Sequence, residues 1–201
     1  MIPVERYMAA AVRLGAKVSN DYLQKRGFIF AVRPDGLRIF NLKRIDERIR
    51  IAARMIARYP PNRVLAHSTK PYASRPIQMF CKFVGCIAVT GRLIPGTLTN
   101  PNLPTHMDVD LLIVADPKTD AQAVNEAAIM GIPVIALVDT DSDISYIDLA
   151  IPCNNKGRNS LAMVFWLLAR QVLRERGELK PDQDLPVSWE EFRVPLAQQQ
   201  G

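Results

Sequence analysis

The segment DLLIVADPKTDAQAVNEAAIMGIPVIALVDT, residues 110–140, decides the fold class of this chain. Residues 110–115 form a short apolar run that is typical of a buried strand. Residues 120–130 then predict a helix, and Gly131 suits the left-handed position that follows many helices. A second apolar run at residues 133–138 predicts another buried strand. A strand, a helix and a strand of these lengths indicate a parallel sheet covered by helices.

The same alternation extends on both sides of this segment. Further strands are expected at residues 63–67, at 86–90 and near Leu149, and a hairpin at 28–32 and 37–40, turned by the RPDG segment, residues 33–36. Further helices are expected at residues 4–14, 43–59, 74–84 and 158–176. The sequence therefore predicts an α/β fold, doubly wound, with a mainly parallel sheet, helices on both faces, an N-terminal hairpin and an extended C-terminal tail.

Residues 1–177 are expected to form a single α/β domain, and residues 178–201 a tail. The tail contains three prolines and a Gln-rich end, so it lacks a periodic apolar face. Trp189 and Phe192 are its two aromatic side chains, and they predict an arm that docks on a protein partner. The alternative, that both side chains pack on the parent domain, stays open.

Composition excludes several classes of protein. A hydrophobic share of 48% and a charged share of 23% are typical of a globular chain. No apolar run reaches the roughly 18 residues of a membrane span, and residues 1–7 do not resemble a signal peptide, so no membrane partner is expected. The odd count of three cysteines, Cys81, Cys86 and Cys153, without a CxxC motif, favours buried thiols in a reducing cytoplasm over a disulfide framework.

Charge is distributed unevenly along the chain. Residues 1–82 contain 17 Lys or Arg against five Asp or Glu, whereas residues 83–201 contain nine against 15. The first part therefore has a net charge of +12 and the second of −6. Such asymmetry indicates a polyanionic partner on one side of the molecule and other partners elsewhere.

The predicted helix at residues 43–59 carries most of this positive charge. Its apolar residues share one face at 100° per residue, and Lys and Arg cover most of the other side. Such a row can neutralise successive phosphates of RNA, although a merely solvated helix face is the alternative. The cations of the N-terminal half that we expect to contact RNA are Arg13, Lys17, Lys25, Arg26, Arg44, Arg48 and Arg54.

Aromatic residues alternate with basic ones around the predicted hairpin. Phe28 and Phe30 share one strand face, and we expect both in the core. A surface that stacks on single-stranded RNA is the minority interpretation.

Two loops add polar candidates for RNA contact. The segment at residues 91–108 is long, and loops of this length are commonly functional. Its Arg92, Thr97 and Asn100 suit phosphate and ribose oxygens. The turn at residues 154–158 leads into a helix N-terminus, which attracts anions, and Lys156 and Arg158 flank it.

Catalytic and metal-binding patterns are weak in this sequence. It contains no GxGxxG and no GxxxxGK[ST] motif, and its cysteines and histidines lack zinc-finger spacing. The acidic loop at residues 139–148 follows a strand, where α/β enzymes place metal-binding carboxylates, but its Thr and Ser residues indicate turn chemistry. We therefore expect no catalytic residue, no metal and no cofactor. The alternative is a doubly wound enzyme or phosphosugar-binding domain that uses this loop.

Several motifs, in order, carry a family resemblance. They are RPDG at 33–36, DERI at 46–49, GRLIPGTLTNP at 91–101, GIPVIAL at 131–137, DTD at 139–141, PCNNKGR at 152–158 and WLLAR at 166–170. Together they resemble the second small-subunit ribosomal protein family in its archaeal and eukaryotic branch, which includes ribosomal protein SA, the laminin-receptor precursor. The absence of a long acidic extension and of a coiled-coil insertion points to the archaeal type.

This resemblance implies a structural component of the small ribosomal subunit with no catalytic activity. Its expected partners are small-subunit ribosomal RNA and neighbouring ribosomal proteins, no small-molecule substrate is expected, and the expected location is cytoplasmic and ribosome-bound. Arg13 departs from the family, whose members usually carry histidine at this position, so the role of that histidine cannot be transferred to Arg13. A general basic RNA chaperone is a third hypothesis.

Overall fold

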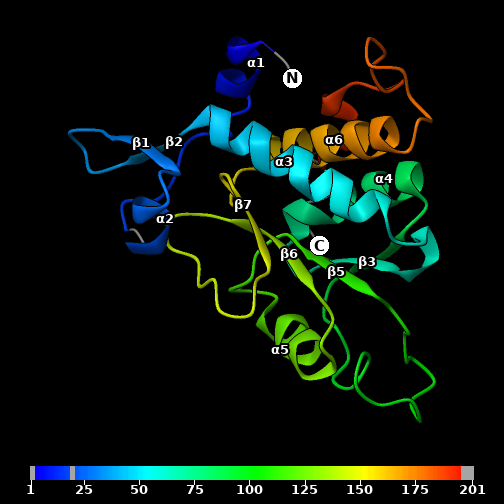
Figure 1. Cartoon of the computed structure of the whole chain (residues 1–201). Helices are drawn as coiled ribbons and strands as arrows, with labels where there is room; N and C mark the ends of the chain where they lie inside the picture. Colours follow the sequence, from blue (N-terminus) through cyan, green and yellow to red (C-terminus); the bar gives the residue numbers. More distant parts are fainter. Residues whose placement is uncertain (1–2, 19–20, 196–201) are drawn as a thin grey trace.

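A computed structural model describes residues 3–18 and 21–195. Its centre is a five-stranded sheet in the order β4-β3-β5-β6-β7, in which every neighbouring pair is parallel (Figure 1). The strands are β3 (Val64–Ser68), β4 (Ile87–Thr90), β5 (Leu111–Val114), β6 (Val134–Val138) and β7 (Leu149–Pro152). Every residue of β3, β5 and β6 is buried, as expected of central parallel strands covered on both faces.

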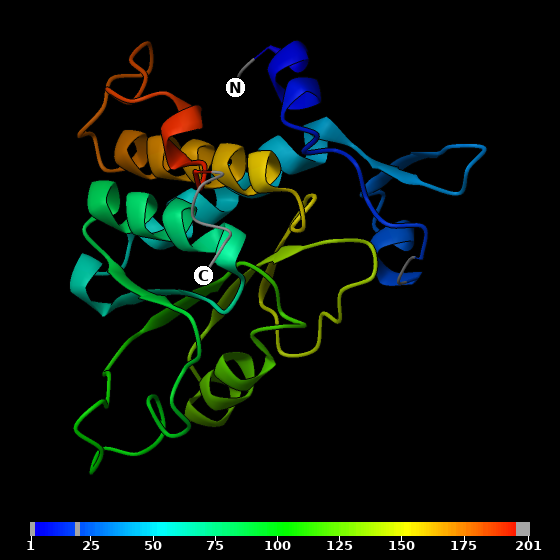
Figure 2. The same ribbon diagram turned by 180° about the vertical axis from the view of Figure 1, so that it is seen from behind.

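Helices cover both faces of this sheet. Three of them, α3 (Leu42–Ala57), α4 (Pro71–Val84) and α6 (Arg158–Glu175), form one layer, and α5 (Ala121–Met130) lies on the opposite face (Figures 1 and 2). A short 3₁₀ helix, η1 (Pro61–Arg63), leads into β3. The predicted fold class, a doubly wound α/β sheet with helices on both faces, is confirmed. Among the described helices, none is long and apolar enough to cross a membrane.

The predicted hairpin is also present, as a separate two-stranded antiparallel sheet of β1 (Ile29–Val32) and β2 (Arg38–Phe40). Gly36 in its turn has φ of 84°, a left-handed value that glycine adopts without strain. A bridge between Leu14 and Ile39 ties the preceding segment to β2. We call residues 11–18 and 21–40 the hairpin lobe; it protrudes beside the N-terminal end of α3 (Figure 1).

The expectation that Phe28 and Phe30 both lie in the core is wrong for one of them. Phe28 is buried, but the Phe30 side chain is 68% exposed. Strict alternation fails here because β1 begins only at Ile29 and its pairing with β2 is irregular between Ile29 and Ala31.

The N-terminal segment differs from the prediction in two further places. Helix α1 (Val4–Ala9) ends before residue 14, because Ala11 has φ of 55° and a left-handed residue cannot continue a right-handed helix. Helix α2 (Asp21–Lys25) was not predicted, since five residues are too few for a periodic pattern to be recognised.

The described part of the C-terminal tail packs on the parent domain. Phe192 is fully buried, and its ring stacks on Phe83 of α4 with 6.0 Å between centroids. Trp189 begins the 3₁₀ helix η2 (Trp189–Phe192) and is half-buried against the main core cluster. The tail is also held by Trp166 of α6, whose indole N–H donates to the Val187 carbonyl at 2.9 Å. The expectation that Phe192 binds a partner is therefore corrected, because its side chain is fully buried against α4. Trp189 is only half-buried, so its contact with a protein partner stays a prediction. The alternative left open, packing on the parent domain, is the observed arrangement; residues 196–201 of the predicted tail lie outside the described residues.

Candidate nucleic-acid interface

Helix α3 turns an apolar face to the core and a basic face to solvent. The apolar face includes Ile45, Ile49 and Ile56, whose side chains are fully buried. Its N-terminus is capped by Asn41, whose side-chain oxygen accepts a hydrogen bond from the Lys43 backbone N–H at 3.1 Å. The exposed cations of this helix and its C-terminal cap are Lys43, Arg44, Arg50, Arg54 and Arg58.

The three arginines of α3 that the sequence proposed differ in their partners. Arg44 forms an ion pair with Glu47 at 2.8 Å and thereby holds the pKa of that carboxyl below its usual value. Arg54 lies 3.5 Å from Glu175 of α6. Arg48 instead lies over the Phe28 ring at 5.1 Å and has no carboxylate partner among the described residues. Exposed pairs of this kind stabilise little and can exchange for phosphate, but Arg48 has no pair to break.

The hairpin lobe adds four of the proposed cations. Lys17 and Lys25 are exposed, and Arg26 lies over the Tyr22 ring at 5.1 Å. Arg13 contacts the Phe30 ring at 5.8 Å and the Met8 sulfur at 3.6 Å, which is a weak acceptor. Among the described side chains of residues 3–18 and 22–195, no carboxylate forms an ion pair with any of these four cations. The structure thus brings them together with Arg48 at one end of the molecule.

Backbone contacts fix the lobe to the carboxyl edge of the sheet. The Gly15 N–H donates to the Arg38 carbonyl at 2.8 Å, and the Ala16 N–H donates to the Thr140 hydroxyl at 2.9 Å. At the next strand, the Asn154 N–H donates to the Val12 carbonyl at 2.9 Å. The first contact lies within the lobe, whereas the other two join residues more than a hundred positions apart, so the basic lobe is positioned by the end of β6 and by the turn after β7.

The long loop between β4 and β5 is held by a carboxylate that the sequence analysis missed. Glu126 of α5 accepts hydrogen bonds from the backbone N–H groups of Gly96 at 2.9 Å and Leu98 at 3.0 Å. Burial alone would raise the pKa of Glu126, but these bonds outweigh it and leave the pKa below its usual value. A possible signal was its position on the apolar face of α5, beside the buried Ala123 and Ala127.

The candidates on this loop do not share one environment. Arg92 and Asn100 are exposed, although the Asn100 side-chain oxygen accepts from the Asn102 N–H at 3.1 Å. Thr97 is buried, and its hydroxyl donates to the Ile94 carbonyl at 2.6 Å. The expectation that Thr97 contacts RNA is therefore corrected, because its hydroxyl is occupied within the loop.

The turn before α6 has internal roles as well. Asn154 accepts hydrogen bonds from the N–H groups of Lys156 and Gly157, both at 3.0 Å, which fix the turn just before the first residue of α6. Lys156 pairs with Asp141 at 2.6 Å, and Arg158 donates to the Val194 carbonyl at 3.1 Å. Both flanking cations thus have internal partners, but no described side chain caps the helix, so the anion site at this N-terminus stays a prediction.

The acidic loop at residues 139–148 is built as a set of turns. Asp139 accepts from the Thr140 N–H at 2.6 Å, and Asp148 accepts from the Val134 N–H at 2.8 Å. Burial raises the pKa of Asp139. Burial also opposes the charge of Lys156, but its hydrogen bond to Asp141 and the nearby charge of Asp139 raise the Lys156 pKa on balance. Within the described residues, no group of three or more His, Cys, Asp or Glu is placed to hold a metal ion.

Doubly wound folds bind ligands in the crevice where the strand order reverses, here between the carboxyl ends of β3 and β5. Side chains of this chain fill that crevice. Lys70 Nζ lies 2.6 Å from Asp116 and donates to the Asn155 carbonyl at 3.1 Å, while the Asn155 amide donates to Asp116 at 3.2 Å. Asp120 accepts from the Thr69 N–H at 2.7 Å. Apart from the Asn155 side-chain oxygen, which is buried without a partner among the described residues, these groups satisfy one another, which disfavours an enzyme or phosphosugar site at this edge.

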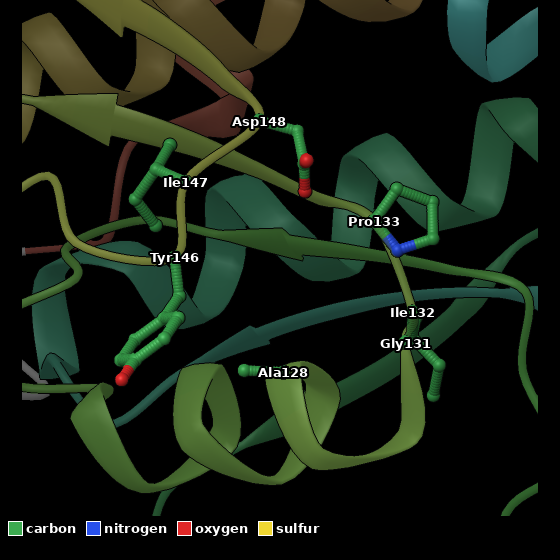
Figure 3. A pocket seen from close by; sticks show the side chains of 7 residues that line it. All are labelled: Ala128, Gly131, Ile132, Pro133, Tyr146, Ile147 and Asp148. Atoms are coloured by element: carbon green, nitrogen blue, oxygen red, sulfur yellow. The ribbon is translucent and has the colours of Figure 1, made fainter.

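A surface pocket of about 320 Å³ lies at the opposite, amino end of β6. Figure 3 shows its lining, which comes from the end of α5, the start of β6 and the segment before β7. Its one carboxylate, Asp148, already accepts a backbone hydrogen bond, and Tyr146 is 67% exposed at its rim. Small-molecule sites combine an apolar cavity with convergent polar groups, and this open pocket does not.

The fold and its polar groups thus define a class: a doubly wound α/β protein whose ligand crevice is filled by its own side chains and whose basic surface is exposed. Comparison with known proteins specifies the family. The family model for ribosomal protein S2 matches residues 102–175. Small ribosomal subunit protein uS2 of Caldivirga maquilingensis is 83% identical over 98% of this chain and 92% of its own length. The uS2 proteins of Pyrobaculum neutrophilum and Thermofilum pendens are 71% and 52% identical, over 98% and 96% of this chain and 96% and 90% of their own lengths.

The chain belongs to the ribosomal protein S2 family. The resemblance predicted from its motifs is confirmed, including the archaeal type. The prediction that it is not an enzyme is confirmed by the same membership, because ribosomal protein S2 is a structural family.

Proposed function

We propose that this protein is a structural component of the small ribosomal subunit that binds ribosomal RNA through the hairpin lobe and the basic face of α3. It supports subunit assembly and translation, and it works bound to the ribosome in the cytoplasm. Its acidic half contacts neighbouring ribosomal proteins. Arg92 and Asn100 on the long loop make a second, smaller RNA contact.

The observation that carries this proposal is the difference in pairing between the cations of the turn before α6 and those of the hairpin lobe with Arg48. Lys156 and Arg158, in the acidic half, are bound to internal acceptors. Among the side chains that the structure describes, no carboxylate forms an ion pair with the proposed lobe cations, Arg13, Lys17, Lys25 and Arg26, or with Arg48, although a positive charge on a protein surface is readily paired. Unpaired cations that converge on one surface are the electrostatic footprint of a phosphate backbone.

Sedimentation tests the proposal at the level of the subunit. Native lysate is separated on sucrose gradients at low and high salt, and the protein is followed by immunoblot. We expect it to migrate with small subunits in stoichiometric amount and to remain there at moderate salt. Recovery mainly at the top of the gradient, as free protein, would contradict the proposal.

A pair of charge variants tests the assigned surface. Lys25→Gln removes a lobe cation, and Lys118→Gln removes a lysine of the acidic half that is also exposed. Affinity for deproteinised small-subunit RNA is measured from about 50 to 200 mM salt, the range in which phosphate contacts change affinity strongly. Each lost phosphate contact lowers the salt slope by roughly one, so we expect this change for Lys25→Gln and none for the control. The reverse pattern would place the RNA on the acidic half.

A further inference from the structure

The middle of strand β1 exposes a large aromatic side chain. Phe30 is 68% exposed, and Val32, two residues further along the same strand face, is 57% exposed. Helices cover both faces of the main sheet, but within the described residues none covers this outer face of the hairpin (Figures 1 and 2). An exposed aromatic residue beside a second apolar one marks a surface that binds something.

The atoms around Phe30 favour an anionic occupant. The Arg13 guanidinium lies 5.8 Å from the ring centroid. The Nε atom of Arg13 is buried and has no acceptor among the described residues, and the same is true of Arg38 Nε on the neighbouring strand. Such donors normally have a partner, so the hairpin offers hydrogen bonds that this part of the chain does not use.

The charge of the hairpin lobe distinguishes between the two macromolecules that could cover this surface, a basic protein and a nucleic acid. Residues 11–40 contain six Lys or Arg and two Asp or Glu. One of the two acids, Asp35, is turned to its own hairpin, since it lies 3.5 Å from Arg33 and accepts from the Leu37 N–H. A basic neighbour would be repelled by this lobe, whereas a nucleic acid would be attracted.

We propose that Phe30 is a stacking platform for an unpaired base of small-subunit ribosomal RNA. The base lies on the exposed ring, and Arg13, Arg38 and the other lobe cations contact the adjoining phosphates. Aromatic side chains bind splayed-out bases in this way, with little dependence on sequence. The inference rests on the proposed function and adds to it the chemistry of one contact.

The test uses the full-length protein and small-subunit RNA freed of its proteins. Phe30→Leu keeps an apolar side chain but removes the ring, Phe30→Trp keeps a ring, and Val32→Ala is the control on the same face. Loss of base stacking weakens binding by roughly 5- to 100-fold, so we expect that effect for Phe30→Leu only. Its salt slope should equal that of the wild type, because no charge is lost.

Irradiation of native small subunits at 254 nm provides a second measurement. We expect a peptide containing Phe30 to carry a covalently attached nucleotide, since a stacked ring and base are close enough to crosslink. Equal RNA affinity of Phe30→Leu and wild type would overturn the inference. Loss of the variant from subunits with unchanged affinity for free RNA would also overturn it and would assign the ring to a protein neighbour. If the wild type itself fails to bind the RNA, the proposed function fails first, which is a distinct result.

Discussion

Gly15 lies where the hairpin lobe meets the sheet, and a single methyl group at this position should weaken the junction. A Cβ atom there would lie 2.6 Å from Thr140 Cγ2, 3.2 Å from Thr140 Oγ1 and 3.3 Å from the Arg38 carbonyl oxygen. Thr140 is fully buried, and its hydroxyl exchanges hydrogen bonds with the Ala16 N–H and carbonyl, so the side chain has no room to rotate away.

The size of the effect follows from these distances. Carbon atoms in good contact lie about 3.5–4.0 Å apart, so Gly15→Ala requires a shift of about 1 Å. Forcing extra methyl groups into a packed site costs about 1–3 kcal/mol, and the lower chain entropy of unfolded alanine offsets about 0.4–1 kcal/mol. The net loss is about 1–2 kcal/mol, and for a chain of this length it lowers Tm by about 2–8 °C.

Thermal unfolding followed by circular dichroism measures this loss. The matched experiment repeats Gly15→Ala in a Thr140→Ser background, which removes the clashing methyl group and keeps the hydroxyl. We expect Gly15→Ala to cost less in that background, with an interaction free energy of about 1 kcal/mol between the two sites. If Gly15→Ala leaves Tm unchanged, or if its cost is the same in both backgrounds, the close approach of Gly15 to Thr140 is refuted.

Three further predictions concern other parts of the fold. Ala11→Gly relieves a left-handed residue at φ of 55°, a strain of about 1–2 kcal/mol that is partly offset by greater unfolded-state entropy, so calorimetry should show a Tm that is equal or higher, not lower. Glu126→Gln weakens the charge-assisted bonds to Gly96 and Leu98 by about 1–3 kcal/mol in total, which faster amide exchange at these two residues would reveal. Because folding lowers the Glu126 pKa, the stabilisation by this carboxylate is present above the usual value of 4.5 and is lost as pH falls through the folded pKa. The difference in free energy of unfolding between wild type and Glu126→Gln should therefore shrink below about pH 4.5 in urea titrations. A difference that stays constant with pH would contradict this. Phe192→Ala empties a fully buried site against Phe83 and should cost about 3–5 kcal/mol, whereas a side chain that only docks on a partner would cost almost nothing in the isolated protein.

Features that depend on neighbouring residues could be predicted from the sequence. The run of strand, helix and strand at residues 110–140 appears as β5, α5 and β6, with Gly131 at φ of 70° directly after the helix. The turn of the hairpin was located correctly for the same reason, since Gly36 adopts a backbone conformation that other residues avoid. These elements follow from periodicity and from local backbone preferences.

The burial and the ion pairing of each charged or polar candidate residue could not be predicted from its neighbours in the sequence. Arg54 is paired with Glu175, which lies 121 positions further along the chain. Thr97 turned inward because Glu126, on a helix beyond the next strand, holds its loop. Nothing in the sequence near these residues indicates such partners.

The sequence by itself thus determined the α/β alternation, the uneven charge and the family, because all three are properties of residue order. Only the tertiary structure decided which cations remain unpaired, that Phe30 faces outward and that Phe192 faces inward. The physical reason is that burial and ion pairing depend on groups that folding brings together from distant positions, such as Ala16 and Thr140.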